Sequence, residues 1–177
     1  AFEKIDEALI RSLVIGHAKI PVPALYLECG QLPIRYILAC RRLLYLQTIL
    51  HREPNELIQR VYLAQRKDPS EGDFCQIVDK DRQLLDLWLS DDQISNMSVY
   101  ELKTLARKKA KEQAFQRLIA IKETKTKMDN ISYTNCYQTQ PYIKVLSREK
   151  SSLLLALRTR TVRGIRSDYG DLFPSKE

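Results

Sequence analysis

The sequence contains few of the residues from which most catalytic sites are built. Its 177 residues include only two histidines and five glycines. The Gly-rich motifs that hold nucleotide phosphates, G-x-x-x-x-G-K-[ST] and G-x-G-x-x-G, are absent. Since His17 and His51 lie far apart in sequence, a Cys-His or Ser-His pair would require a coincidence of folding. We therefore expect this chain to be no enzyme by itself.

Metal-binding and membrane-spanning patterns are missing as well. The four cysteines form no C-x-x-C pair, and neither histidine lies near one at zinc-ligand spacing. No apolar run approaches the roughly 20 residues of a membrane helix. The first twenty residues mix charges into the apolar pattern, unlike a signal peptide. We expect free thiols, no metal, no cofactor, no membrane partner and an intracellular location, nuclear or cytoplasmic.

The composition favours helices, because glycine is scarce whereas Leu, Ile, Lys, Arg and Gln are plentiful. We predict a mainly α fold, an irregular multi-helix bundle of about six to eight helices. It comprises one helical domain over 1–166, or two subdomains meeting near 90–98, and a flexible tail over 167–177. The spacing of apolar residues predicts helices over 2–15, 34–51, 55–65, 73–88, 99–122 and 148–163, with a short helical turn over 24–29.

Several local patterns make sharper predictions. Phe2, Ile5, Leu9 and Leu13 share one face of the first helix. A stripe of Leu57, Ile58, Val61 and Tyr62 is expected to be buried. The segment Arg66–Gly72 is typical of a loop, and 131–143 of an irregular segment. In the helix over 99–122, five small or apolar residues recur every four positions and predict a close helix contact. They are Leu102, Ala106, Ala110, Ala114 and Leu118.

Paired acidic residues have a structural interpretation. Asp91 and Asp92 follow Ser90, which has capping-box spacing to Gln93, so we favour a role at a helix start over a two-metal site. Ser98 and Glu101 repeat that spacing before the long helix. Asp79 and Asp81 alternate with basic residues and are expected to be surface charges.

The net charge of +7 is concentrated in residues 101–166, which hold 16 Lys and Arg against 5 Asp and Glu. Such a surplus can bind a polyanion or simply cover a solvated helix face. Tyr133, Tyr137 and Tyr142 could stack bases or pack within the fold. Our candidate nucleic-acid-binding residues are Arg41, Arg42, Arg107, Lys108, Lys111, Arg158, Arg160, Arg163 and Arg166.

Four segments resemble, in the same order, the region after the polymerase domain of non-LTR (LINE-type) retrotransposon polyproteins. They are LYLECGQLPIRYILACRRLLYLQTILHRE, ELIQRVYLAQRKDPSEGDF, AFQRLIAIK and LLLALRTRTV. The resemblance implies a non-catalytic segment that holds template RNA or target DNA beside a neighbouring polymerase domain, whose catalytic residues match no position here. The alternative is a helical protein–protein interaction scaffold that uses the broad apolar surface of 34–51.

Overall fold

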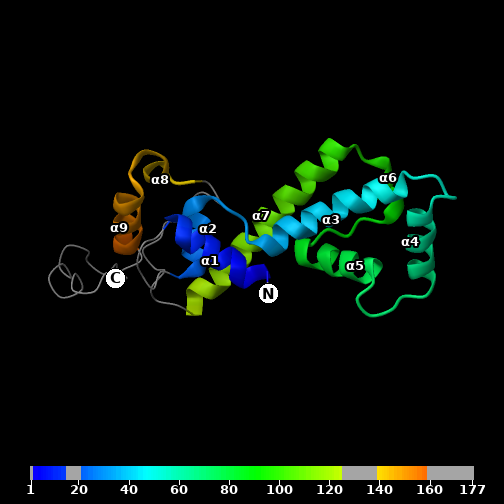
Figure 1. Cartoon of the computed structure of the whole chain (residues 1–177), viewed down its shortest axis with the longest axis horizontal. Helices are drawn as coiled ribbons and strands as arrows, with labels where there is room; N and C mark the ends of the chain where they lie inside the picture. The colour runs from blue at the N-terminus through cyan, green and yellow to red at the C-terminus, as the bar shows by residue number, and fades with distance from the viewer. Residues whose placement is uncertain (1, 15–20, 125–138, 159–177) are drawn as a thin grey trace. The chain divides into compact units, whose positions relative to one another are not determined.

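The computed structural model describes residues 2–14, 21–124 and 139–158. These residues form nine α-helices and no β-strand, which confirms the predicted mainly α fold (Figure 1). The chain divides into a central unit, Pro33–Ala114, and a terminal unit, Ala1–Leu32 with Phe115–Glu177. This division differs from the boundary near 90–98 considered above.

The central unit is built around α3 (Ile34–Leu50). Three other helices pack against α3: α4 (Leu57–Lys67), α5 (Phe74–Leu85) and α6 (Asp91–Asn96). The side chains that α3 buries include Ala39, Leu43 and Leu46. The Gln47 side-chain amide donates to the carbonyls of Ile94 and Met97, at 3.0 and 2.7 Å. These two hydrogen bonds attach the C-terminal end of α6 to α3.

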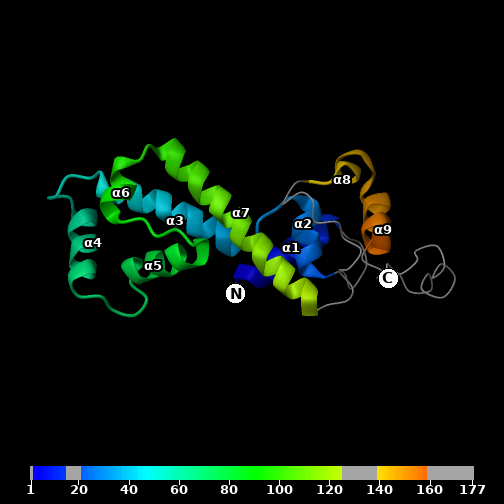
Figure 2. The same ribbon diagram turned by 180° about the vertical axis from the view of Figure 1, so that it is seen from behind.

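The longest helix, α7 (Val99–Thr124), has its first part in the central unit. There it crosses α3, on the side that faces the viewer in Figure 2. All five residues of the predicted four-residue repeat are buried, so that pattern is confirmed. The alanines leave only methyl groups to fill the contact, which allows a helix to approach closely.

The predictions for α4 were partly wrong. This helix begins at Leu57 and continues to Lys67, so Arg66 is helical and the following loop begins at Asp68. Of the predicted buried stripe, only Tyr62 is buried, whereas Leu57, Ile58 and Val61 are exposed. The periodicity identified a helix, but it could not tell which face of that helix has a neighbour.

The helix α5 ends at Leu85 and not near Trp88. Asp86 adopts the left-handed conformation with φ of 49°, and the N–H of Leu87 donates to the carbonyl of Arg82 at 2.9 Å. These features form a helix C-cap that is usually made by glycine. Trp88 therefore lies in the connection between α5 and α6.

The terminal unit contains α1 (Phe2–Val14), α2 (Val22–Cys29), α8 (Pro141–Val145) and α9 (Arg148–Arg158), together with the end of α7. The helix α1 packs against α2 and α9, and α2 supplies most of the buried residues. Phe2, Ile5 and Leu9, which the sequence places on one face of this helix, are exposed, whereas Ile10 is buried. The helix α8 was not predicted, although Pro141 is a favourable first residue for a helix.

Candidate nucleic-acid interface

The main group of unpaired cations in the central unit lies on α7. We call Lys103, Arg107, Lys111 and the adjacent Lys108 the basic row. Lys103, Arg107 and Lys111 are four residues apart, which places successive side chains about 6 Å apart along the helix axis. Each directly follows a member of the buried alanine and leucine stripe. The packing that buries the stripe therefore also determines which way the side chains of the basic row point.

The start of this helix is also fixed by the sequence. The N–H of Ser98 donates to the Glu101 carboxylate at 2.9 Å, and the N–H of Glu101 donates to the Ser98 hydroxyl at 3.1 Å. The predicted capping box is thus confirmed. The hydrogen bonds with Ser98 lower the pKa of Glu101, so its carboxylate remains charged at the positive end of the helix dipole.

All four cations of the basic row are exposed. Within the part of the chain that the structure describes, none of their side chains forms an ion pair or hydrogen bond. Arg107 lies close enough to Cys40 on α3 for its charge to act on that thiol. Burial nevertheless raises the pKa of Cys40 to about 11, against the lowering effect of Arg107. Because the four cations are exposed and form no ion pair among the described residues, an external anion can bind to them.

Two cations near the basic row, Lys109 and Arg42, form ion pairs within the protein. Lys109 contacts Asp86 at 3.3 Å and Glu112 at 3.9 Å. Arg42 donates from Nε and a terminal nitrogen to the two oxygens of Asp81, at 2.5 and 2.7 Å. Asp81 is only 4% exposed, so the expectation of a surface charge was wrong there. Arg42 serves an internal ion pair, whereas Arg41, on α3, is exposed.

Four predicted site residues cannot be placed in the interface. Arg158 ends α9, but its side chain lies outside the described residues, as do Arg160, Arg163 and Arg166. Of the three tyrosines considered for stacking, only Tyr142 is described. Its hydroxyl donates to the buried Glu28 carboxylate at 2.8 Å, so this tyrosine packs within the terminal unit.

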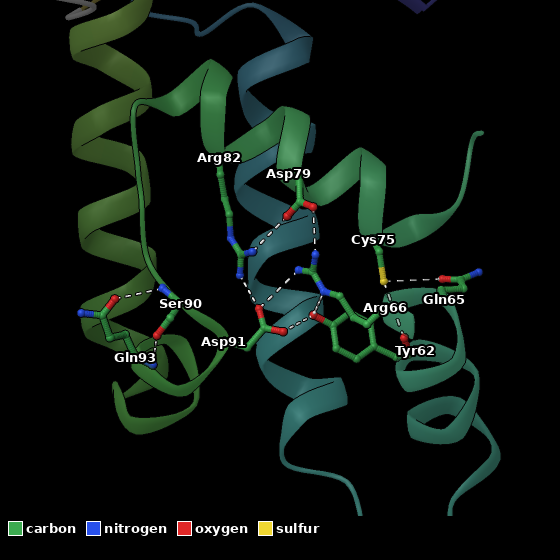
Figure 3. Close-up of polar contacts among 9 residues, drawn as sticks. All are labelled: Tyr62, Gln65, Arg66, Cys75, Asp79, Arg82, Ser90, Asp91 and Gln93. Carbon is green, nitrogen blue, oxygen red and sulfur yellow. Dashed lines mark hydrogen bonds and ion pairs between the residues drawn. The ribbon is translucent and has the colours of Figure 1, made fainter. Parts of the chain in front are cut away.

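A second charged cluster in the central unit is internally paired. We call Arg66, Asp79, Arg82 and Asp91 the charge ring (Figure 3). Arg66 binds Asp79 at 2.8 Å, and Asp79 accepts from Arg82 at 3.0 Å. Arg82 contacts Asp91 at 2.5 Å, and Asp91 closes the ring to Arg66 at 3.4 Å. The ring has no net formal charge, because its two arginines and two aspartates pair with one another. Since these residues come from α4, α5 and α6, their ion pairs link the three helices.

Tyr62 completes the charge ring. Its hydroxyl donates to Asp91 and accepts from Arg66 Nε at 2.8 Å. Burial and the hydrogen bond to Asp91 raise the pKa of Tyr62, which keeps the phenol protonated. Burial alone would raise the pKa of Asp91, but the hydrogen bonds from Tyr62 and Arg82 and the charges of Arg66 and Arg82 lower it. Asp91 is therefore a paired carboxylate at the start of α6.

The charge ring was not predicted from the sequence. Asp79 was expected to be a simple surface charge, yet it bridges two arginines. The capping box of Ser90 and Gln93 is confirmed, with N–H donors at 2.9 and 3.2 Å, and it positions Asp91 in the first turn of α6. The only sequence signal for the ring was that Asp79 and Arg82 are three residues apart, as neighbours on a helix are.

The remaining reactive groups do not form a site. Cys29, Cys40 and Cys75 are buried free thiols, and burial raises the pKa of each. In the described segments, no three or more His, Cys, Asp or Glu side chains are grouped to hold a metal ion. No helix in those same segments has both the length and the apolar character needed to cross a bilayer. Comparisons with models of known protein families, with curated proteins and with solved structures give no significant match.

Proposed function

We propose that this chain is a non-catalytic helical segment that binds the phosphate backbone of RNA or DNA through the basic row of α7. The observation that carries the proposal is the presence of four exposed cations, without partners among the described residues, on one capped helix. Such cations remain hydrated in the free protein and can replace the counterions of a polyanion on binding. The exposed Arg41 is a further candidate contact.

The proposal extends to the origin of the chain. The order of the four segments that resemble non-LTR retrotransposon polyproteins supports a segment that positions template RNA or target DNA for a neighbouring polymerase domain. Backbone contacts suit this role, because a template must be held whatever its sequence. An intracellular location, nuclear or cytoplasmic, belongs to the same proposal.

The test is a salt titration of binding. The affinity of the full chain for RNA and DNA oligonucleotides would be measured between about 50 and 200 mM salt. A triple variant, Lys103→Gln, Arg107→Gln and Lys111→Gln, removes three proposed contacts. Each contact contributes about 0.7 to 0.9 to the slope of log affinity against log salt, so the slope should fall by about two to three.

The central unit provides a matched control. Arg60, Lys67 and Lys80 are exposed cations on α4 and α5, and replacing all three with glutamine removes the same total charge. This control variant should keep most of the wild-type slope. An equal loss in the two triple variants would show a general effect of net charge, and the proposed interface would be wrong.

Exposed apolar side chains favour a second candidate function, a protein interaction surface. They lie on α4, where Leu57 is 76% exposed and Ile58 and Val61 are also exposed; α3, which the sequence suggested, exposes only Tyr45 among its large apolar side chains. Association that rises with protein concentration and is lost in a Leu57→Ser, Val61→Ser variant would support this function. A monomer that captures no partner through this face would contradict it.

A further inference from the structure

Thr104 lies among the cations of the basic row. It is exposed on α7, three residues before Arg107 and four before Lys108. Residues three and four apart on a helix are neighbours, with about 5 to 6 Å between their Cβ atoms. Arg107 and Lys108 point about 100° apart around the axis, and Thr104 points between them, one turn nearer the start of the helix. The three side chains therefore border one patch on the exposed side of α7.

The turn of α7 that carries Thr104 is fixed by packing. Leu102 and Ala106, two residues before and after Thr104, have no exposed surface. Each points about 160° away from Thr104 around the axis, so their burial keeps Thr104 on the outer side of the helix. Glu101, the nearest carboxylate in sequence, accepts from the N–H of Ser98 at 2.9 Å and is thus held at the start of the helix.

The hydroxyl of Thr104 is an unused hydrogen-bond donor. It has no partner among the described residues. A threonine inside a helix often donates to the carbonyl four residues before it, as Thr48 of α3 does to Leu44 at 3.2 Å. The patch thus offers one neutral donor beside the cationic donors of Arg107 and Lys108. Such a set suits an anion that has several oxygens.

We infer that a backbone phosphate of the nucleic acid binds between Arg107 and Lys108 and accepts a hydrogen bond from the Thr104 hydroxyl. Hydroxyl side chains contact phosphate in nucleic-acid-binding proteins alongside Arg and Lys. A phosphodiester has two free oxygens, so it can accept from the hydroxyl and still contact the cations. Lys103 and Lys111 remain for neighbouring phosphates. This inference rests on the proposed function, because the same side of α7 must meet the backbone.

The test separates the hydroxyl from the charges. Thr104→Val keeps the shape of the side chain and removes the donor. The loss of a hydrogen bond to a charged group should lower the affinity of the full chain for RNA and DNA oligonucleotides about three- to tenfold. Because no charge changes, the slope of log affinity against log salt should keep its wild-type value. Thr104→Ser keeps the hydroxyl and should bind like wild type.

Thr48→Val supplies the matched control. Thr48 is also an exposed helical threonine, but its hydroxyl serves its own helix, so this variant should bind like wild type. Thr104→Glu places a carboxylate three and four residues before Arg107 and Lys108, where it can pair with them. It should lower both the affinity and the salt slope. Circular dichroism would confirm that each variant is as helical as wild type.

The outcomes distinguish the two proposals. The inference would be overturned if Thr104→Val bound as tightly as Thr48→Val, if Thr104→Ser were as weak as Thr104→Val, or if Thr104→Glu bound like wild type. A lower salt slope in Thr104→Val would also overturn it, because a charge contact would then have been lost. Salt-dependent binding through the basic row would survive each of these results. Binding that does not respond to the glutamine substitutions in the row would overturn the proposed function and the inference together.

Discussion

The charge ring and the basic row lie in the same unit, yet the charges of the ring are paired within the fold and those of the row are not. Arg66 and Arg82 of the ring each contact two carboxylates, so their charge is neutralised within the fold. The cations of the row contact no described carboxylate and remain exposed. Partial burial makes a paired charge structural, whereas exposure without a partner makes it available to a polyanion.

The neighbours Arg41 and Arg42 show the same difference over one residue. Successive residues of a helix point about 100° apart, so only Arg42 reaches Asp81 on α5. The adjacent Arg41 is exposed. Counting basic residues therefore overstates a binding surface, because some of them hold the protein together.

The largest expected effect comes from breaking the ring. Arg82→Ala leaves Asp79 and Asp91 to share Arg66, and Arg82 is only 11% exposed. Removing one partner of a buried pair costs about 3–5 kcal/mol, and the partial exposure of the carboxylates reduces this to about 2–3 kcal/mol of unfolding free energy. Urea unfolding would measure it. In contrast, each glutamine substitution in the row should change the unfolding free energy by no more than about 0.5 kcal/mol.

A smaller effect should appear as a dependence on pH. The pKa of Asp91 is lowered in the folded protein, so its contribution is present above the unfolded pKa of about 3.9 and is lost as pH falls through the folded value. Asp91→Asn should be less stable than wild type at neutral pH, and this difference should shrink towards about pH 3. Urea unfolding along that pH range would measure it.

Asp92 supplies the control for this pH dependence, because it is exposed and lies outside the ring. Asp92→Asn should follow the wild-type profile. A difference between Asp91→Asn and wild type that stays constant with pH would mean that the ionised carboxylate contributes nothing to stability.

The basic row could be predicted because its signals are local. The four-residue repeat from Leu102 to Leu118 determines the buried side of α7, and the cations that directly follow its members, Lys103, Arg107 and Lys111, are exposed. Ser98 and Glu101 mark the start of the helix within four residues. Helix propensity, capping and periodicity all predict a helix that starts near Ser98 and buries this repeat, and the structure has that helix.

The charge ring could not be predicted, because its members come from three helices. Arg66 and Asp91 are 25 residues apart, and their contact depends on how α4, α5 and α6 pack. The same packing buries the polar Tyr62 and leaves the apolar Leu57 exposed, which reverses the order that hydrophobicity alone suggests. The position of Trp88 outside a helix was not predicted either, because the sequence extended this helix to 88 whereas it ends at Leu85.

The smallest expected effect concerns the geometry of arginine. Arg82→Lys keeps the charge but loses the planar fork that reaches Asp79 and Asp91 together. Because Arg82 Nε is buried without a partner among the described residues, the loss should be only about 1 kcal/mol of unfolding free energy.

Arg107→Lys in the row should change neither stability nor affinity for nucleic acid measurably, since a point charge suffices for a backbone contact. Urea unfolding and the salt titration would compare the two variants. If Arg107→Lys weakened binding as strongly as Arg107→Gln, Arg107 would be gripping its anion with two donors, and the row would carry a more specific site than a simple line of charge.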